Sequence, residues 1–183
     1  MYRAMIGALV TAVTFSPLAL AGSHVEEFHA VFSGFNEVGG LNAETGAILS
    51  DGKATLRLRF DRVQQSISYT LNFSGLGTAV TQAHIHFGKV HMPGGVMVFF
   101  CSNLPNPPPN TQACPASGTI SGTITATNVV GPAAQGVTAG DFQAVVDALE
   151  NDTAYANIHT TAFPAGEIRG EIRRGFSLGF FDE

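Results

Sequence analysis

The clearest candidates for chemistry in this sequence are two histidines that stand two residues apart. His84 and His86 lie in the segment 82–88, where they alternate with small or apolar residues. In an extended strand, successive side chains point to opposite faces, so the two imidazoles share one face about 7 Å apart along the chain. Imidazoles at that spacing can bind one metal ion through bonds of about 2.0–2.1 Å. The alternative is a pair of histidines that are hydrogen bonded to neighbouring loops.

A third imidazole is available from His159, near the end of a predicted strand over 154–160. We therefore predict one mononuclear site made by His84, His86 and His159, with His91 or Glu167 as a fourth ligand or as a neighbour that orients the ligands. Three neutral imidazoles without a thiolate suit Cu(II) or Zn(II), and the order of divalent affinities favours copper at nitrogen ligands. The cofactor prediction is thus copper or zinc.

A metal-free polar network is the competing interpretation of the same region. Buried polar side chains need hydrogen-bond partners, and several polar residues could order the loops at one end of the fold. The candidates for this network are Glu37, Asn157, His159, Glu167 and Arg169. His84 and His86 could join it without any ion. The sequence leaves the two interpretations open.

Composition and charge limit the class of partner. The chain has 183 residues, a formal net charge of −5 and only nine lysines and arginines, which are scattered. Nucleic-acid binding requires clustered cations that neutralise phosphates, so this class of partner is excluded. Few charges, 21 glycines and no tryptophan indicate a β-rich exported domain. We expect the partner to be an extracellular protein or a small ligand.

The N-terminal segment has the pattern of a secretory leader. Arg3 precedes an uncharged apolar run over 4–20, and residues 19–21 read Ala-Leu-Ala, an A-x-A cleavage pattern. We predict that 1–21 is a signal peptide and that 22–183 is a single domain, secreted or periplasmic, with no membrane span after cleavage. An uncleaved anchor is the alternative.

The two cysteines, Cys101 and Cys114, are predicted to form a disulfide, because an even pair in an oxidising compartment is most simply bonded. The segment between them is rich in proline and asparagine, which excludes a helix or a central strand. Closing such a loop is worth about 3 kcal/mol in the chain-entropy model. A bonded pair also excludes a blue-copper thiolate site.

Alternating apolar and polar residues predict short strands along most of the chain. Besides the strand that carries His84 and His86, the predicted strands are 27–33, 53–60, 66–73, 96–100, 117–126, 154–160 and 167–173. One helix is predicted over 138–150, with Thr138 as N-cap and Asp141 as the acid of a capping box. The charged face of 167–173 is interpreted as solvated ladder pairs, and the apolar tail over 175–181 as an edge strand or the cover of a patch. The pattern is typical of a β-sandwich or Greek-key barrel.

Four motifs in order resemble the CHRD domain, a family named for its repeats in chordin. They are 36–38 (Asn-Glu-Val), 83–88 (Ala-His-Ile-His-Phe-Gly), 155–160 (Tyr-Ala-Asn-Ile-His-Thr) and 164–171 (Pro-Ala-Gly-Glu-Ile-Arg-Gly-Glu). The resemblance covers about 27–173. It implies a secreted all-β protein with an antiparallel Greek-key β-sandwich, immunoglobulin-like or Cu,Zn superoxide-dismutase-like, to which the helical pattern adds one short helix.

The resemblance leaves two classes of function open. The dismutase also carries copper on a His-x-His strand, which makes a copper-dependent oxidoreductase of that type one alternative. No Gly-x-Ser-x-Gly, Ser-x-x-Lys or His-Glu-x-x-His motif is present, and no catalytic residues are assigned. We therefore favour a secreted binding or structural module over an enzyme.

Overall fold

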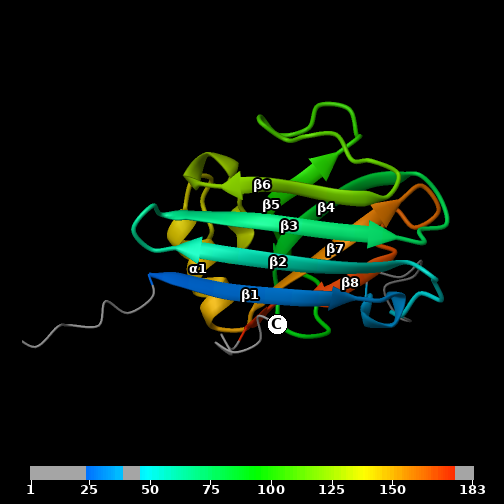
Figure 1. Ribbon diagram of the computed structural model, residues 1–183, viewed down its shortest axis with the longest axis horizontal. Coiled ribbons are helices and arrows are strands. Elements are labelled where there is room, and N and C mark those ends of the chain that lie inside the picture. Colours follow the sequence, from blue (N-terminus) through cyan, green and yellow to red (C-terminus); the bar gives the residue numbers. More distant parts are fainter. Residues whose placement is uncertain (1–23, 39–45, 176–183) are drawn as a thin grey trace, which may run out of the picture.

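The protein consists mainly of two antiparallel β-sheets that face each other, which confirms the predicted all-β sandwich. The computed structural model describes residues 24–38 and 46–175; the predicted signal peptide and the tail beyond Gly175 lie outside the described residues. In Figure 1 the five-stranded sheet lies in front of the four-stranded sheet, and α1 lies at one end of the sandwich.

The five-stranded sheet has the order β6-β3-β2-β1-β9 and the four-stranded sheet the order β5-β4-β7-β8. The strands of the first are β1 (Val25–Phe32), β2 (Lys53–Asp61), β3 (Ser66–Ser74), β6 (Gly118–Ile124) and β9 (Arg173–Arg174). Those of the second are β4 (Val80–Phe87), β5 (Gly95–Ser102), β7 (Ala154–Thr160) and β8 (Ile168–Glu171). The described helical segments are α1 (Phe142–Glu150) and the 3₁₀ turns Gly34–Asn36, Ala126–Asn128 and Ala133–Gln135.

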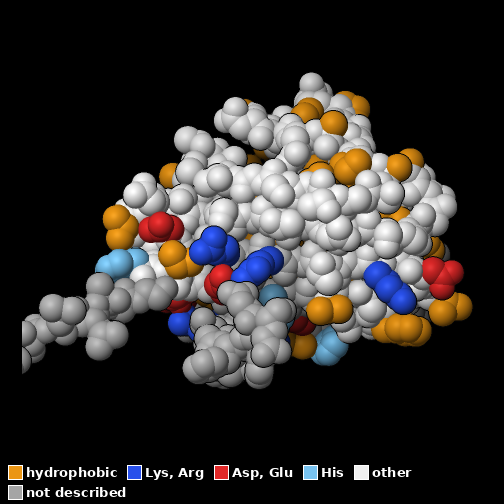
Figure 2. Space-filling view, in the orientation of Figure 1, with side chains coloured by type: hydrophobic (Ala, Val, Ile, Leu, Met, Phe, Trp, Pro, Cys, Tyr) orange, Lys and Arg blue, Asp and Glu red, His pale blue; other side chains and the backbone are white. Residues whose placement is uncertain are grey.

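The core lies between the sheets because alternate residues of each strand point inward. Leu58, Leu71 and Ile85 are fully buried there. The outer face of the five-stranded sheet carries mostly uncharged polar side chains, with a few charged ones near its centre (Figure 2). Arg57 on this face pairs with Glu27 at 2.7 Å while 65% of its side chain is exposed. This confirms the predicted alternation of β2 and β3.

The helix begins later than predicted. Asp141, not Thr138, is the N-cap, and its carboxylate accepts a hydrogen bond from Ala144 N at 3.1 Å. The reason is Gly140, whose φ of +88° is left-handed and cannot belong to a right-handed helical turn. Within the helix, an apolar stripe from Phe142 to Leu149 is buried against the core.

The predicted strand over 167–173 is wrong in one respect, because the chain changes sheets within it. β8 pairs with β7, whereas β9 pairs with β1 in the other sheet. Ile172 lies between them and is fully buried. Because the first and last described strands are neighbours, Gly175 N donates a hydrogen bond to Glu27 O at 2.7 Å.

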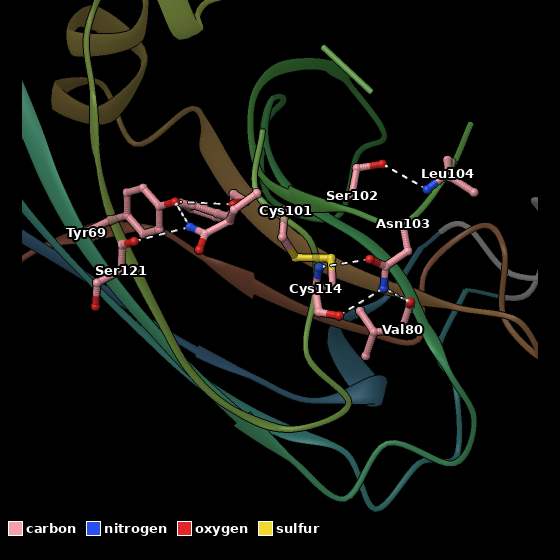
Figure 3. Close-up of a disulfide and its surroundings, with 10 residues drawn as sticks. Tyr69, Val80, Cys101, Ser102, Asn103, Leu104, Cys114 and Ser121 are labelled. Atoms are coloured by element: carbon pink, nitrogen blue, oxygen red, sulfur yellow. Dashed lines mark hydrogen bonds between the residues drawn. A yellow bond between two sulfur atoms is a disulfide. The ribbon is translucent and has the colours of Figure 1, made fainter. Parts of the chain in front are cut away.

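The predicted disulfide is present. Cys101, at the end of β5, is bonded to Cys114, with an S–S distance of 2.08 Å (Figure 3). The Asn103 side chain holds the base of the loop, since its amide nitrogen donates to Val80 O and Cys114 O, each at 2.9 Å. The proline-rich segment is thereby attached to β4 as well as to β5.

Removing the disulfide should destabilise the fold. We expect the Cys101→Ala/Cys114→Ala variant to lose about 3 kcal/mol of unfolding free energy, because the 13-residue separation then adds loop freedom to the unfolded chain. Urea denaturation of both proteins measures the loss. Adding a reductant should lower the midpoint of the wild type alone; an equal effect on the variant would contradict the assignment.

Candidate metal centre

The pairing of β4 with β7 brings the three histidines together. In this register Gln82 lies opposite His159, His84 opposite Asn157, and His86 opposite Tyr155. Residues that face each other across an antiparallel pair project to the same side of the sheet. The intervening residues of both strands are buried in the core, so the histidines occupy the outer face of the four-stranded sheet.

The three rings form a compact group. The ring centroids of His84 lie 4.6 Å from those of both His86 and His159. One nitrogen from each ring lies within 4.8 Å of the others. The β4–β5 pairing contains register shifts on either side of His84 and Ile85, and such irregularities increase local twist and re-aim side chains. This confirms the predicted convergence of the three imidazoles.

Aromatic and cationic groups support the rings. His86 stacks on Tyr155 with centroids 4.6 Å apart and an interplanar angle of 4°. Arg169 Cζ lies 3.4 Å from the Tyr155 ring centroid, which is a cation–π contact. On the other side, Phe99 meets the His84 ring edge-on at 5.1 Å. These contacts restrict the rotation of the His86 and His84 rings.

Two loops cover this outer face, which explains why its polar side chains are buried. The β4–β5 loop places Gly94 O 2.7 Å from His86 Nδ1, and the β7–β8 loop places Pro164 O 2.9 Å from His159 Nδ1. Gly94 must be glycine, because a Cβ at this position would collide with the Phe87 carbonyl oxygen. The loops thus replace water as the neighbours of the imidazoles.

The predicted polar residues are hydrogen bonded around the centre, but among them, within the described part of the chain, only Asn157 and Glu37 bond to each other. Asn157 Nδ2 donates to Glu37 Oε2 at 3.5 Å, and both residues are buried. Arg169 pairs with Glu171 at 2.8 Å and donates to the carbonyl oxygens of Met92 and Lys89. The solvated ladder predicted for 167–173 is therefore wrong for Arg169, which is fully buried beneath the β4–β5 loop.

Glu167 binds loops and does not join the three nitrogens. Its carboxylate accepts hydrogen bonds from Ser50 Oγ at 2.6 Å and from Thr160 Oγ1 at 2.7 Å, and it is 1% exposed. The metal-ligating group that the described residues form contains neither Glu167 nor His91. His91 is an exposed residue of the β4–β5 loop with a left-handed φ of 58°. The structure thus brings together three of the five predicted ligand candidates.

Enclosure keeps the imidazoles neutral. Burial, reinforced by the neighbouring rings of His86 and His159, holds the pKa of His84 well below its usual value. Burial lowers the pKa of His86 to about 4 and also lowers the pKa of His159. A neutral imidazole retains a lone pair, which is the form that binds a metal ion.

Two ring nitrogens of the three histidines have no hydrogen-bond partner among the described residues. His159 Nδ1 must carry its proton, because Pro164 O can only accept, and this leaves the lone pair on Nε2. His159 Nε2 and His84 Nδ1 are both buried, and neither has a hydrogen bond to any of the described residues. A proton on the remote nitrogen, held by a backbone carbonyl, is the usual arrangement of a metal-ligating histidine.

Both ring nitrogens of His86 lie close to an oxygen atom, and only one of them can carry a proton in the neutral ring. Gly94 O lies 2.7 Å from Nδ1 and Asn157 Oδ1 lies 3.0 Å from Nε2, yet a neutral imidazole has only one N–H. The shorter contact assigns the proton to Nδ1, so the Nε2 lone pair faces an amide oxygen. A cation near Nε2 would turn this repulsion into attraction.

A family model for the CHRD domain matches residues 28–172. The chain belongs to the CHRD domain family. CHRD domains are extracellular, and the Cys101–Cys114 disulfide fits an oxidising compartment. Comparison with curated proteins and with solved structures gave no match. Within 24–38 and 46–175, no helix is long and apolar enough to cross a membrane.

The sequence did not predict the groups that hold the three histidines of this CHRD domain in place. Tyr155 lies on the same face of β7 as Asn157 and His159, so the two-residue period of the strand could have identified it. Phe99 could not be identified in that way, since its contact with His84 depends on the irregular β4–β5 register. The carbonyl groups of Gly94 and Pro164 carry no side-chain signal at all.

Proposed function

We propose that this CHRD domain is an extracellular binding module that holds one transition-metal ion, copper or zinc, through His84, His86 and His159. The observation that carries the proposal is a pair of buried nitrogens, His84 Nδ1 and His159 Nε2, that have no hydrogen-bond partner within 24–38 and 46–175. They belong to a group whose ligand atoms lie within 4.8 Å of one another. Ligands of one ion lie about 3.5 Å apart when the bonds are about 2.0–2.1 Å long. Binding therefore requires the rings to close by about 1 Å.

A metal-free hydrogen-bond network does not provide partners for His84 Nδ1 and His159 Nε2. Glu37, Asn157 and Arg169 all find partners among the described residues, yet the network leaves two ring nitrogens unsatisfied. Each unpartnered buried polar group costs about 1–3 kcal/mol. A metal ion would use both lone pairs at once, so we interpret the network as the frame of the site and not as its purpose.

The burial of the three histidines favours a site that binds an ion without catalysis, rather than one that converts a substrate. An oxidoreductase of the dismutase type needs an ion that its substrate can reach, whereas the three histidines are at most 8% exposed. Two of the rings are also capped by backbone carbonyls. The copper-dependent oxidoreductase is therefore the second candidate.

Calorimetric titration tests metal binding. We expect the untagged mature protein, freed of metal by dialysis against a chelator, to bind one equivalent of Zn(II) or Cu(II). A His84→Ala/His86→Ala variant should lose at least about 100-fold in affinity, because removing even an outer neighbour of a ligand typically costs 10–100-fold. Equal binding by the two proteins would overturn the proposal.

Two exposed histidines provide matched controls. His29→Ala removes an imidazole from the outer face of β1 and should leave the affinity unchanged. His91→Ala tests the predicted fourth ligand, and an unchanged affinity would restrict the site to three histidines. Assaying the copper-loaded protein for superoxide dismutation separates the two candidate functions.

A further inference from the structure

A second candidate site lies on the outer face of the five-stranded sheet, on the other side of the sandwich from the histidines. It is a cavity of about 400 Å³ near the end of β1. Its side chains come from β1, β2, β3 and the turn after β1, and they include Val31, Phe35, Lys53, Thr55, Asn72 and Ser74. Small-molecule sites enclose about 300–1,000 Å³. The cavity is therefore large enough for a small ligand or for one unit of a polymer.

The apolar part of this cavity faces water. Val31 and Phe35 are each 68% exposed. Figure 2 shows exposed hydrophobic side chains gathered near this end of β1. Exposed apolar groups with polar neighbours are typical of binding sites. The Phe35 ring is therefore available to pack against a ligand.

Backbone hydrogen bonds fix the turn that carries Phe35. Ser33 exchanges two of them with Arg169, each 3.1 Å long, and Ile48 N donates to Gly34 O at 2.7 Å. A ring on a fixed turn loses little freedom when a ligand binds, which favours affinity.

The polar part of the cavity has free donors and acceptors. Within 24–38 and 46–175, the side chains of Lys53, Thr55 and Ser74 form no hydrogen bond or ion pair. Asn72 Nδ2 donates to Thr119 Oγ1 at 2.6 Å, which orients the amide and leaves its oxygen able to accept. Hydroxyl, amide and ammonium groups thus lie beside an exposed aromatic ring.

Beyond the cavity, the outer face of β3 and β6 continues as rows of uncharged polar side chains. The cross-strand pairs of this face are Asn72 with Thr119, Thr70 with Ser121, and Ser68 with Thr123. Successive pairs lie about 7 Å apart along the strands. Arg57 and Arg59, which share this side of the sheet, lie on β2 and pair with Glu27. Because Asn72 belongs to both regions, the cavity is continuous with a surface on which an extended neutral ligand can lie.

These groups match the chemistry of a sugar. The C–H face of a pyranose ring packs on an aromatic ring, and its hydroxyls exchange hydrogen bonds with hydroxyl and amide groups. An apolar ligand would cover Thr55, Asn72 and Ser74 without pairing them, which costs free energy. An anionic ligand would find a single cation, Lys53, among the residues that line the cavity.

We propose that this face binds a neutral polysaccharide, with one sugar ring on Phe35 and its hydroxyls on Thr55 and Asn72. The rows on β3 and β6 hold the sugar units that follow. The inference goes beyond the metal binding proposed above, because the site lies on the other sheet and uses none of the three histidines.

Titration with defined sugars tests the inference. The ¹⁵N-labelled mature protein is titrated with cellohexaose, laminarihexaose and chitohexaose, and binding is followed by NMR. We expect at least one of them to bind and to shift the amide signals of Phe35, Thr55 and Asn72. Phe35→Ala should lower the affinity at least about tenfold, because it removes the stacked ring. Asn72→Ala should lower it about fivefold through the lost hydrogen bond.

Val63→Ala is the matched control, because Val63 is 65% exposed in the turn between β2 and β3 and lies outside the cavity. Its affinity should equal that of the wild type. Raising the salt concentration should not weaken binding of a neutral sugar, since salt screens charges only. A chelator should have no effect either, which separates this site from the metal centre.

Three results would overturn the inference. The first is that none of the three sugars binds. The second is that sedimentation shows a dimer that Phe35→Ala dissociates, which would make the cavity a contact between two copies. The third is that the sugars bind only after residues 176–183 are deleted, which would make the tail the natural occupant. In each case the metal-binding proposal would stand or fall on its own titration.

Discussion

Stability should fall steeply as the pH drops from about 6.5 to about 4. The unfolded chain binds a proton at each histidine near pH 6.5, whereas burial holds the pKa of folded His86 at about 4. Between these values the unfolded state binds more protons, so acid favours unfolding, and the loss persists below pH 4. His86 alone accounts for about 3 kcal/mol, and the lowered pKa values of His84 and His159 add to it.

Urea denaturation of the metal-free protein across this pH range measures the effect. A His84→Gln/His86→Gln/His159→Gln variant is the control, because glutamine keeps polar atoms at these positions but does not titrate. Its stability should depend much less on pH between about 6.5 and 4. The same slope in both proteins would show that other groups cause the acid sensitivity.

Arg169→Met should destabilise the fold by about 3–5 kcal/mol, because it breaks a buried ion pair by removing one partner. Methionine fills much of the space over the Tyr155 ring but leaves the Glu171 carboxylate, which is 14% exposed, without its cation. The carbonyl oxygens of Met92 and Lys89 lose their donors as well. The measurement is the change in unfolding free energy at pH 7.

A matched variant lies four residues along the chain. Arg173 pairs with Asp152 at 3.2 Å, but the two side chains are 38% and 59% exposed. Exposed pairs are worth about 0–1 kcal/mol, so Arg173→Met should have little effect. Similar losses of unfolding free energy for the two variants would mean that burial does not make the Arg169 ion pair more important for stability than an exposed pair.

The strands and the histidine pair could be predicted because they depend on local periodicity. Strict alternation in β2 and β3 determines which side chains enter the core, and the same period of two places His84 and His86 on one face. The predicted strand over 154–160 added His159 near its end. The convergence of the three imidazoles was a hypothesis, because periodicity does not specify that β7 pairs with β4.

The burial of the charged residues could not be predicted in this way. Alternating charges over 167–173 are typical of a solvated face, and only the loops that cover the sheet make Arg169 and Glu167 interior residues. Loop positions depend on long-range contacts, which periodicity does not encode. The prediction of where the helix starts was wrong for a local reason. Thr138 is a suitable N-cap residue, but the left-handed Gly140 prevents a helical turn there.

The adjacency of β1 and β9 determines how the protein responds to mechanical force. The two strands are antiparallel, so the start of β1 and the end of β9 lie at the same end of this strand pair. There Gly175 N donates a hydrogen bond to Glu27 O. Tension applied through these two points would load the hydrogen bonds one after another instead of shearing them together. We therefore expect β1 and β9 to separate under a smaller force than strands that are loaded in shear.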